Sequence, residues 1–421
     1  MILLLGAIIF TQTLPAVVID LAGALSRART GGQQYLAATV DAAIAKEDRV
    51  QAKAALLPTV DFDNQYIFTQ GDHEGGGVFV GNDGVHVYTS QGVVHADAFS
   101  ATHRLEYRRA LAAEALARAR QDVALRGLSA SVIRNYYEFV SAQRRLANAQ
   151  RSLEEAQNFL DVTQRLEGGG EVAHADVIKA QILLEQRKRD ALESQLDIDK
   201  ARIALAVFIF PDYNEDFSVV DDLGTLAPLG LYADIQNAAR TTSPDILAAQ
   251  TALSQESLGV SIARSASLPS LSLDYIYGIN ANQFAINSGD RRNLGYSVQA
   301  TVNVPIFNWG ARKSQVRQAE LRQQQAQLEL ALTQKEFLSN LNTLYREAQI
   351  ARTQTDSLKT SLDLAAESLR LVLLRYQAGE VSVLEVSDAQ TTLAEARNAY
   401  DEGLVRYKAA WADLQVQTGN F

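Results

Sequence analysis

The sequence predicts a mainly α-helical protein with a β-barrel portion, built from two tandem copies of one unit: helix, strand, strand, long helix, helix. Three observations support this fold class. The chain repeats itself at a nearly constant offset, its prolines avoid two long stretches, and segments of alternating polarity separate the expected helices. At 421 residues, 47% hydrophobic and 21% charged, the chain does not have a disordered composition.

Charge and cysteine content exclude several classes of protein. The formal net charge is −10, and nucleic-acid phosphates require basic surfaces, so we expect no nucleic-acid partner. The chain has no cysteine, which excludes disulfides, cysteine-based zinc sites and thiol catalysis. This composition suits any compartment, including an oxidising periplasm.

The internal repeat sets the expected boundaries. The stretch ARTGGQQYLAA at 28–38 resembles ARTTSPDILAA at 239–249, and the tripeptide GEV recurs at 170–172 and 379–381. Because the matches keep their order and their helical spacing, they indicate a duplication. We expect residues 20–210 to form the first repeat, 211–230 an inter-repeat segment, and 231–421 the second repeat.

Residues 1–19 precede the first repeat. Ile2 to Phe10 is an apolar run that is too short to span a bilayer and fits the central region of a signal peptide. No Lys or Arg precedes this run, and no clean A-x-A site follows it. Either the true start lies upstream and the run belongs to a secretion signal, or the segment is the ordinary apolar start of a strand or helix.

Proline placement predicts the helices. None of the seven prolines falls in 59–210 or 306–421, and proline interrupts helices strongly. Within these stretches, strong helix formers predict long helices at about 102–166 and 312–377. A helix of this length reaches about 100 Å, so we expect coiled-coil packing rather than a compact globule. Shorter helices are expected at 30–57, 173–207, 244–267 and 382–417.

Period-two polarity predicts four strands, at about 59–69, 85–102, 270–280 and 294–305. Ten-residue strands with one apolar face fit a transmembrane barrel, and the alternative is a soluble half-buried sheet. Asp63 and Asp274 on the polar face favour a water-filled lumen. The side chains expected to face lipid are Phe62, Tyr66, Phe68, Leu273, Tyr275 and Tyr277.

Four strands cannot close a barrel alone. Open sheet edges cannot face lipid, because each unpaired backbone group there costs several kcal/mol. A membrane-spanning sheet therefore requires association of chains, and three chains would supply about twelve strands, an even number in the usual range.

The element order, together with GGEVAHADVIKAQ at 169–181, YQAGEVSVLEVSDAQTTL at 376–393 and VPIFNWG at 304–310, resembles the outer-membrane efflux protein (TolC) family. The resemblance implies a homotrimer, with a 12-stranded transmembrane barrel on a long α-helical periplasmic tunnel. It also implies a passive exit duct of a tripartite efflux or type I secretion system. The implied partners are a periplasmic adaptor (membrane fusion protein), an inner-membrane transporter and outer-membrane lipid. The implied location is the outer membrane of a Gram-negative bacterium, with 211–230 in a band around the tunnel.

The resemblance also assigns site residues at two helix turns. Tyr376, Glu385 and Asp388 occupy positions that form the periplasmic gate, with both acids facing inward, and Asp176 is the implied hydrogen-bond partner of Tyr376. Val381 stands where the best-known member carries a basic residue, so other contacts, such as those of Arg375, would hold this gate. The turn residues implied to dock the adaptor are Gly170, Val172, Gly379 and Val381.

Alternatives exist for several of these features. Glu385 and Asp388 are spaced i, i+3, and such a pair is by default a solvated helix surface. No histidine or lysine nucleophile lies nearby, so we expect no catalysis, no enzyme activity and no cofactor. The competing function is a soluble coiled-coil scaffold or adaptor protein, which would not need lipid-facing aromatic side chains.

Two further clusters remain open from the sequence. His73, His86 and His95 match no known metal-site spacing, so we expect a polar extracellular loop region and no metal site. Phe307 and Trp309 lie where a strand becomes a helix and are either membrane-interface anchors or packing residues.

Overall fold

The computed structural model describes residues 17–68, 86–289 and 291–419. The chain divides into two compact units. The sheet-bearing unit comprises Thr39–Gln121 and Asp245–Gln334; the tip-bearing unit comprises the residues up to Ala38, Asp122–Pro244 and Lys335–Phe421. Two long helices, α3 (Ala101–Gly168) and α7 (Ala311–Gln377), supply residues to both units. They contain 68 and 67 residues, where the sequence predicts long helices over 102–166 and 312–377.

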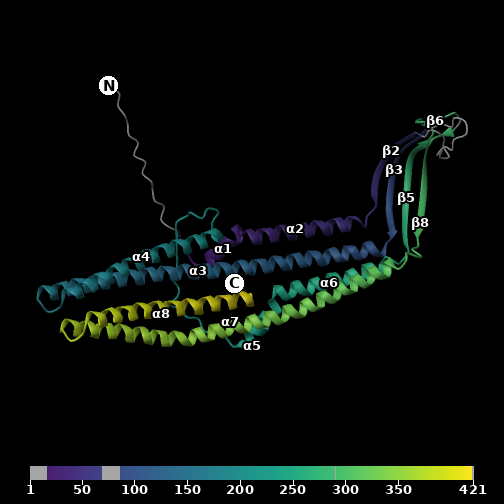
Figure 1. Ribbon diagram of the computed structural model, residues 1–421. Helices are drawn as coiled ribbons and strands as arrows, with labels where there is room; N and C mark the ends of the chain where they lie inside the picture. Colours follow the sequence, from purple (N-terminus) through teal and green to yellow (C-terminus); the bar gives the residue numbers. More distant parts are fainter. Residues whose placement is uncertain (1–16, 69–85, 290, 420–421) are drawn as a thin grey trace, which may run out of the picture. The chain divides into compact units, whose positions relative to one another are not determined.

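The duplicated, mostly helical architecture predicted from the sequence is confirmed. The first half runs α2 (Gln33–Ala54), β2 (Thr59–Phe68), β3 (His86–Phe99), α3 and α4 (His174–Ile209). The second half runs α6 (Pro244–Ser265), β5 (Ser270–Ala281), β8 (Leu294–Asn303), α7 and α8 (Val383–Thr418). A small ribbon, β6 (Asn287–Ser288) with β7 (Arg291–Arg292), joins β5 to β8 (Figure 1). The strand expected to reach residue 102 ends at Phe99, because α3 begins at Ala101.

The four long strands form one antiparallel sheet in the order β2-β3-β5-β8. The register of the strands aligns side chains of like polarity in rows across the whole sheet. One face bears the rows Val60–Val94–Tyr275–Val298 and Phe62–Gly92–Tyr277–Tyr296. The other face bears Thr59–His95–Asp274–Gln299 and Asp63–Gln91–Gly278–Gly295. A slip of one residue would exchange the faces, so this polarity fixes the register.

In the tip-bearing unit, the C-terminal parts of α3 (from Asp122) and α7 (from Lys335) pack with α4 and α8. This unit also contains α1 (Leu21–Gly31), α5 (Tyr232–Thr242) and a parallel pair, β1 (Val17–Ile19) with β4 (Phe217–Val219). Asp20 caps α1 by accepting a hydrogen bond from the Gly23 N–H at 2.8 Å. None of the described helices combines the length and hydropathy needed to cross a bilayer.

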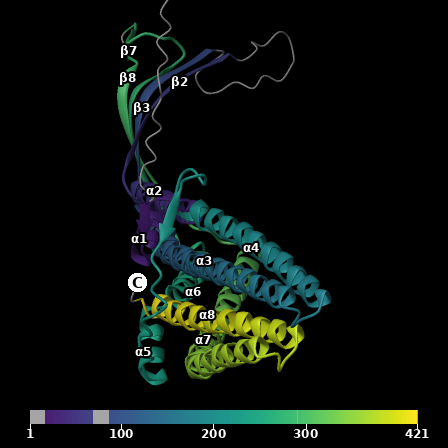
Figure 2. The same ribbon diagram turned by 90° about the vertical axis from the view of Figure 1, so that its left-hand side faces the viewer.

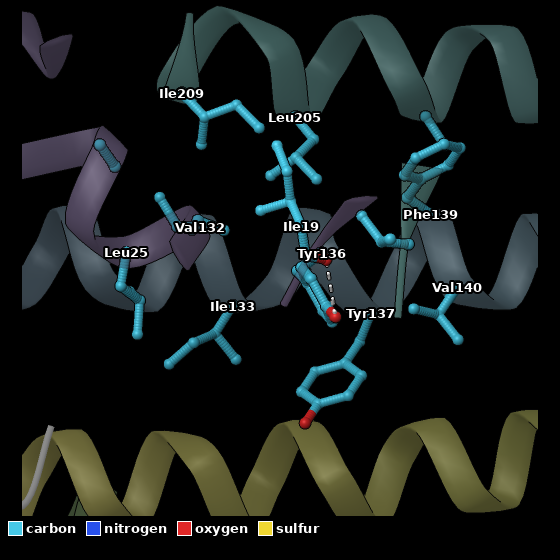
Figure 3. Packing of buried hydrophobic residues seen from close by; sticks show 14 of the residues in the cluster. Ile19, Leu25, Val132, Ile133, Tyr136, Tyr137, Phe139, Val140, Leu205 and Ile209 are labelled. Carbon is cyan, nitrogen blue, oxygen red and sulfur yellow. Dashed lines mark hydrogen bonds between the residues drawn. The ribbon is translucent and has the colours of Figure 1, made fainter. Parts of the chain in front are cut away.

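The hydrophobic core of this unit lies around α3 (Figure 3). Tyr136 and Tyr137 are almost fully buried and meet edge to face, with ring centroids 5.5 Å apart. The Tyr136 hydroxyl donates to the Val220 carbonyl at 2.8 Å, so this buried polar group is satisfied. Burial raises the pKa of both phenols, which stay protonated at any physiological pH.

Charged groups tie α3 and α8 to the segment after β4. Arg144 donates to both carboxylate oxygens of Asp221, at 2.6 and 2.9 Å, and to Asp401 at 2.7 Å. Burial opposes ionisation of Asp221, but the hydrogen bonds from Arg144 and the Leu223 N–H outweigh it and lower its pKa. Lys408 pairs with Asp222 at 2.9 Å.

Burial destabilises the ionised form of the Asp413 side chain on α8. Its Oδ1 is buried and accepts no hydrogen bond from any described residue. Burial, aided by the charge of Glu347 and opposed by that of Arg134, raises its pKa to about 6. Folding therefore takes up a proton between pH of about 4 and 6, and stability declines as the pH rises through that window.

We expect Asp413→Asn to raise the unfolding temperature at pH 7.5 by about 2 °C, because the amide removes the buried charge. The gain should shrink at pH 4.5, where Asp413 is already protonated in the folded state. Thermal unfolding followed by circular dichroism at both pH values measures this. Glu402→Gln, at an exposed position of α8, is the matched control. A gain of the same size at both pH values would contradict this assignment.

Candidate functional site at the helix turns

The α3–α4 and α7–α8 turns lie at the same end of the tip-bearing unit (Figures 1 and 2). Their backbones are near copies of each other. Gly170 and Gly379 adopt φ values of +78° and +77°, a left-handed conformation that glycine alone adopts without strain. In each turn, two N–H groups donate back to the helix end in a Schellman motif. These bonds are Gly170 to Glu167 (2.8 Å), Glu171 to Leu166 (2.9 Å), Gly379 to Tyr376 (3.0 Å) and Glu380 to Arg375 (2.9 Å).

Behind the turns lies a buried cluster, here called the tip core. It consists of Ala156, Phe159, Leu160, Val177, Ala180, Leu183, Leu184, Tyr376, Val383 and Val386. Val172 and Val381, the valines that follow the two turn glycines, are half-buried against it. The tip core therefore holds both turns in place, and the glycines remain exposed at their ends.

Tyr376 is the central polar residue of the tip core. It is only 2% exposed, and its ring meets Phe159 edge to face at 5.2 Å. Its hydroxyl donates to Thr163 Oγ1 at 3.2 Å, and Thr163 itself donates to the Phe159 carbonyl at 2.9 Å. This chain of bonds joins α7 of the second half to α3 of the first half.

The partner of Tyr376 differs from the one that the resemblance implies. Asp176 pairs with Lys179 at 3.3 Å, and the tyrosine bonds to Thr163 instead. Burial raises the pKa of Tyr376, the Thr163 bond opposes this rise, and the charge of Asp176 adds to it. Thr163 was not predicted from the sequence. It lies four residues after Phe159, on the same helix face, and this spacing could have indicated it.

Glu385 and Asp388 lie exposed in the first two turns of α8. Glu385 Oε1 accepts a hydrogen bond from the Ser382 N–H at 3.4 Å, as the third residue of a capping box does. Glu385 therefore has a helix-capping role within one chain. Both acids also lie near the positive end of the helix dipole, where negative charge is favourable.

Polar side chains tie the α7–α8 hairpin to the α3–α4 hairpin near the tip. Arg397 on α8 donates to both carboxylate oxygens of Glu155 on α3, at 2.7 and 3.2 Å. Arg187 on α4, which is 8% exposed, donates to Thr391 Oγ1 on α8 at 2.9 Å. Among the residues that the structure describes, Arg375 forms its one ion pair with Glu380 of its own turn, at 3.3 Å, and none that joins the two hairpins.

The sheet-bearing unit holds the remaining predicted residues. The six side chains expected to face lipid are 41% to 71% exposed: Phe62, Tyr66, Phe68, Leu273, Tyr275 and Tyr277. His95 Nδ1 lies 2.6 Å from Asp274 Oδ1, and His86 Nδ1 lies 2.9 Å from the Tyr66 hydroxyl. His73 falls outside the described residues. Within the described part of the chain, no group of three or more histidine, aspartate or glutamate side chains is arranged so that it could hold a metal ion.

Comparison with known proteins places these features in context. A sequence profile described as "Outer membrane efflux protein" matches residues 24–209 and 235–420. The cobalt-zinc-cadmium resistance protein CzcC of Cupriavidus metallidurans is 26% identical over 302 residues, 70% of this chain and 67% of CzcC. The pyoverdine export outer membrane protein OpmQ of Pseudomonas aeruginosa is 24% identical, over 90% of this chain and 81% of OpmQ. Three other curated relatives are matched over 37% to 64% of their own length.

A solved structure has the same fold. The Campylobacter jejuni CmeC outer membrane channel aligns with a TM-score of 0.83, covering 98% of this chain and 90% of that chain. The sequences are 18% identical, so this likeness establishes the fold alone.

We expect Tyr376→Phe to loosen the tip without collapsing it. The ring keeps its place against Phe159, but Thr163 loses a buried hydrogen-bond donor, at a cost of about 1 kcal/mol. Amides at the start of α8 should then exchange with deuterium about fivefold faster. Hydrogen–deuterium exchange with mass spectrometry measures this, and Tyr213→Phe, at a tyrosine 54% exposed, is the control. Unchanged exchange in Tyr376→Phe would show that the bond to Thr163 does not hold the tip.

Proposed function

Because the chain belongs to the outer membrane efflux protein family, we propose that three copies form the outer-membrane exit duct of a tripartite efflux or type I secretion system. The observation that carries this proposal is the sheet, whose one face exposes aromatic and aliphatic side chains in continuous rows. In water such a face would be a liability, whereas in a bilayer it is the lipid-facing wall of a barrel. The family match leaves the soluble-scaffold alternative without support.

The open edges of the sheet support assembly from several copies. Within the described residues, β2 and β8 each pair with a neighbouring strand on one side only. With four antiparallel strands, β8 runs opposite to β2, so β8 of one copy pairs with β2 of the next without breaking the pattern. Three copies give a closed barrel of about twelve strands and leave no edge exposed to lipid.

Exposed apolar rows on the helices support the same assembly. In the sheet-bearing unit, Val40 and Ile44 of α2 are 57% and 54% exposed, and Leu328 of α7 is 66% exposed. In the tip-bearing unit, similar rows lie on α4 and α7. Their exposed members include Ile182, Leu192, Leu196, Leu364 and Leu374. These rows repeat at three- and four-residue spacing, as coiled-coil seams do, and neighbouring copies would cover them.

The polar face of the sheet gives the barrel an acidic lumen. The four strands contain Asp61, Asp63, Asp97 and Asp274, and neither lysine nor arginine occurs in them. His95 lies beside Asp97 and Asp274 on this face, and Asp61 and Asp63 add further negative charge. A wall whose permanent charges are negative favours cations over anions. The duct itself carries out no chemical step in this proposal.

The two turns form the periplasmic tip of the duct. Glu385 and Asp388, exposed in the single chain, form a ring of six carboxylates around the threefold axis in the trimer. Tyr376, bonded to Thr163, supports this gate from behind, and Asp176 adds its charge near the tyrosine. The adaptor docks on the exposed turns at Gly170, Val172, Gly379 and Val381, and it connects the duct to an inner-membrane transporter. The names of CzcC and OpmQ point to different cargoes, metal ions and pyoverdine. We therefore propose that the transporter, not the duct, chooses the cargo.

The direct test of the duct is reconstitution of the purified chain into planar lipid bilayers. We expect long-lived channels of uniform conductance and a detergent-resistant trimer by native mass spectrometry. A chain that fractionates as a soluble monomer and leaves bilayers silent would contradict the proposal.

Neutralising the tip acids should weaken block by divalent cations. For the Glu385→Gln, Asp388→Asn double variant, we expect the Mg²⁺ concentration that halves the current to rise about tenfold, or about 1.4 kcal/mol of lost attraction. Glu395→Gln, exposed on the same helix, is the control. The same Mg²⁺ block in the double variant and in the control would rule out a gate ring.

Neutralising the lumen acids should change ion selectivity without changing the gate. Asp61→Asn with Asp63→Asn should lower the ratio of potassium to chloride permeability by about twofold or more, because both side chains are exposed on the polar face. The reversal potential in a salt gradient measures this ratio. Asp61→Glu with Asp63→Glu keeps the charge and should leave the ratio unchanged. An equal ratio in the Asn and Glu variants would show that this face does not line the conducting path.

A further inference from the structure

A polar cleft of about 160 Å³ lies between α3, α4 and α8 in the tip-bearing unit, and it is here called the inter-hairpin cleft. Because α3 and α4 form the first hairpin and α8 belongs to the second, the cleft borders both hairpins. Its volume leaves room for more than one water molecule. Most of its lining side chains can donate hydrogen bonds, among them Arg145, Asn148, Ser152, Arg187 and Asn398.

The lining of the inter-hairpin cleft carries positive charge. Arg145 contributes one guanidinium from α3 and Arg187 another from α4, whereas Asp190 is the single acid in the lining, so the formal charge is +1. Asp190 is 42% exposed and already pairs with Arg187, at 3.1 Å. A concave site with this balance attracts anions.

Arg187 is a buried cation whose charge is only partly compensated. Its Nη1 donates to Asp190 Oδ2 at 3.1 Å, and its Nη2 donates to the neutral hydroxyl of Thr391 at 2.9 Å. These bonds use two of the five N–H donors of a guanidinium. A buried charge is costly unless it is paired and fully hydrogen-bonded. An anion in the cleft would supply the charge and the acceptors that Arg187 lacks.

The other two helices offer further donors. On α3, the Arg145 Nη2 donates to Glu138 Oε1 at 2.7 Å, but Glu138 is 56% exposed and lies outside the cleft lining. An exposed pair of this kind contributes little, so Arg145 can turn its remaining donors to a ligand. On α8, Asn398 Oδ1 accepts a hydrogen bond from Asn148 at 3.1 Å. The amide N–H groups of Asn398 donate to none of the described residues.

This arrangement of donors suits a tetrahedral oxyanion. The planar fork of a guanidinium can donate to two oxygens of one phosphate or carboxylate. In the inter-hairpin cleft, however, the donors come from three helices on different sides. A ligand whose oxygens point in four directions can accept from all three helices, whereas a flat carboxylate cannot.

We propose that the inter-hairpin cleft binds a tetrahedral oxyanion, phosphate or sulfate, which clamps the second hairpin to the first. The anion accepts hydrogen bonds from Arg145 and Arg187 of the first hairpin and from Asn398 of the second. It thereby adds a link between the hairpins that depends on the concentration of a solute, and it favours the arrangement in which they lie together. Binding does not depend on the proposed duct, but the effect of the clamp on opening of the tip rests on it.

Phosphorus NMR of inorganic phosphate, titrated into the full chain in a phosphorus-free detergent at pH 7.5, measures the binding. We expect saturable broadening of the phosphate signal with a Kd of about 1 mM. Sulfate should displace phosphate with an affinity within about threefold of it, whereas acetate should bind at least about fivefold more weakly. Broadening that does not saturate would leave no site, and acetate binding as tight as that of phosphate would contradict a tetrahedral ligand.

Two substitutions of nearly equal shape change the charge of the cleft in opposite directions. Asn398→Asp keeps the oxygen that accepts from Asn148 but adds a negative charge, so phosphate should bind at least about tenfold more weakly. Asp190→Asn removes the acid of the lining and should tighten binding about threefold. Circular dichroism verifies that both variants are folded. Equal affinities in the two variants would show that phosphate binds elsewhere.

A pair of arginine substitutions separates the cleft from general surface charge. Arg145→Gln should weaken phosphate binding at least about fivefold, because it removes a donor of the cleft. Arg151→Gln, at an exposed position of the same helix and outside the lining, is the matched control and should bind as the unsubstituted chain does. The same loss in both variants would reduce the binding to non-specific attraction.

Hydrogen–deuterium exchange tests the clamp. At 10 mM phosphate, amides of α8 around Asn398 should exchange about fivefold more slowly, because separation of the hairpins releases the anion. Asn398→Asp should show no such slowing. Exchange that saturating phosphate leaves unchanged in the unsubstituted chain would overturn the clamp.

Planar bilayers connect the clamp to the duct. Phosphate at 10 mM on the side of the tip should lower the open probability of the channel about twofold or more, and Asn398→Asp should abolish this effect. Silent bilayers would defeat the proposed duct and leave phosphate binding intact. Conducting channels whose opening does not respond to phosphate would defeat the clamp alone.

Discussion

The pairing of backbone hydrogen bonds is the constraint on which the rest of the structure depends. In the described part of the chain, the four-stranded antiparallel sheet leaves the outer edges of β2 and β8 unpaired. In water these edges would be tolerable, but the apolar rows across one face indicate a lipid environment, where no water can satisfy them. In the proposed assembly this constraint is met by repetition: each chain contributes an even number of strands, so copies would add edge to edge. Neighbouring copies would also cover the exposed apolar rows on α2, α4 and α7.

Duplication explains the tip but does not make its two turns equivalent. Both halves use the same glycine-centred turn, with φ values of +78° and +77°. Only the second half follows its turn with Glu385 and Asp388, and only the second half places a tyrosine in the tip core. The Tyr376–Thr163 bond and the Arg397–Glu155 pair then join the second hairpin to the first. A movement of one hairpin against the other would break buried or half-buried polar contacts. The two halves are thus linked at a few sites where a conformational change would be costly unless a partner compensated for it.

Much of the fold could be predicted because its signals are local. Proline-free stretches, alternating polarity in VDFDNQY and LSLDYIY, and the repeated GEV turn each depend on residues close in the chain. The apolar face of each strand followed from the same alternation. The hydrogen-bond partners within the site could not be predicted from such local patterns. Asp176 was named as the partner of Tyr376 on the strength of a family pattern, and the structure pairs Tyr376 with Thr163. Thr163 and Tyr376 are 213 positions apart in the sequence. Local spacing therefore cannot indicate whether Tyr376 bonds to the Thr163 hydroxyl or to the Asp176 carboxylate.

The sequence by itself therefore determined which segments are helices and strands, which face of each strand is apolar, and where the chain turns. Tertiary structure alone decided that β3 of the first half pairs with β5 of the second, which makes one sheet of two hairpins. It also decided that Glu385 caps its own helix and that Trp309 takes a strained conformation beside Phe307. The physical reason is the range of the interactions. Periodicity and turn propensity act over a few residues, whereas strand partners, buried hydrogen bonds and strain are set by the packing of segments that are distant in the chain.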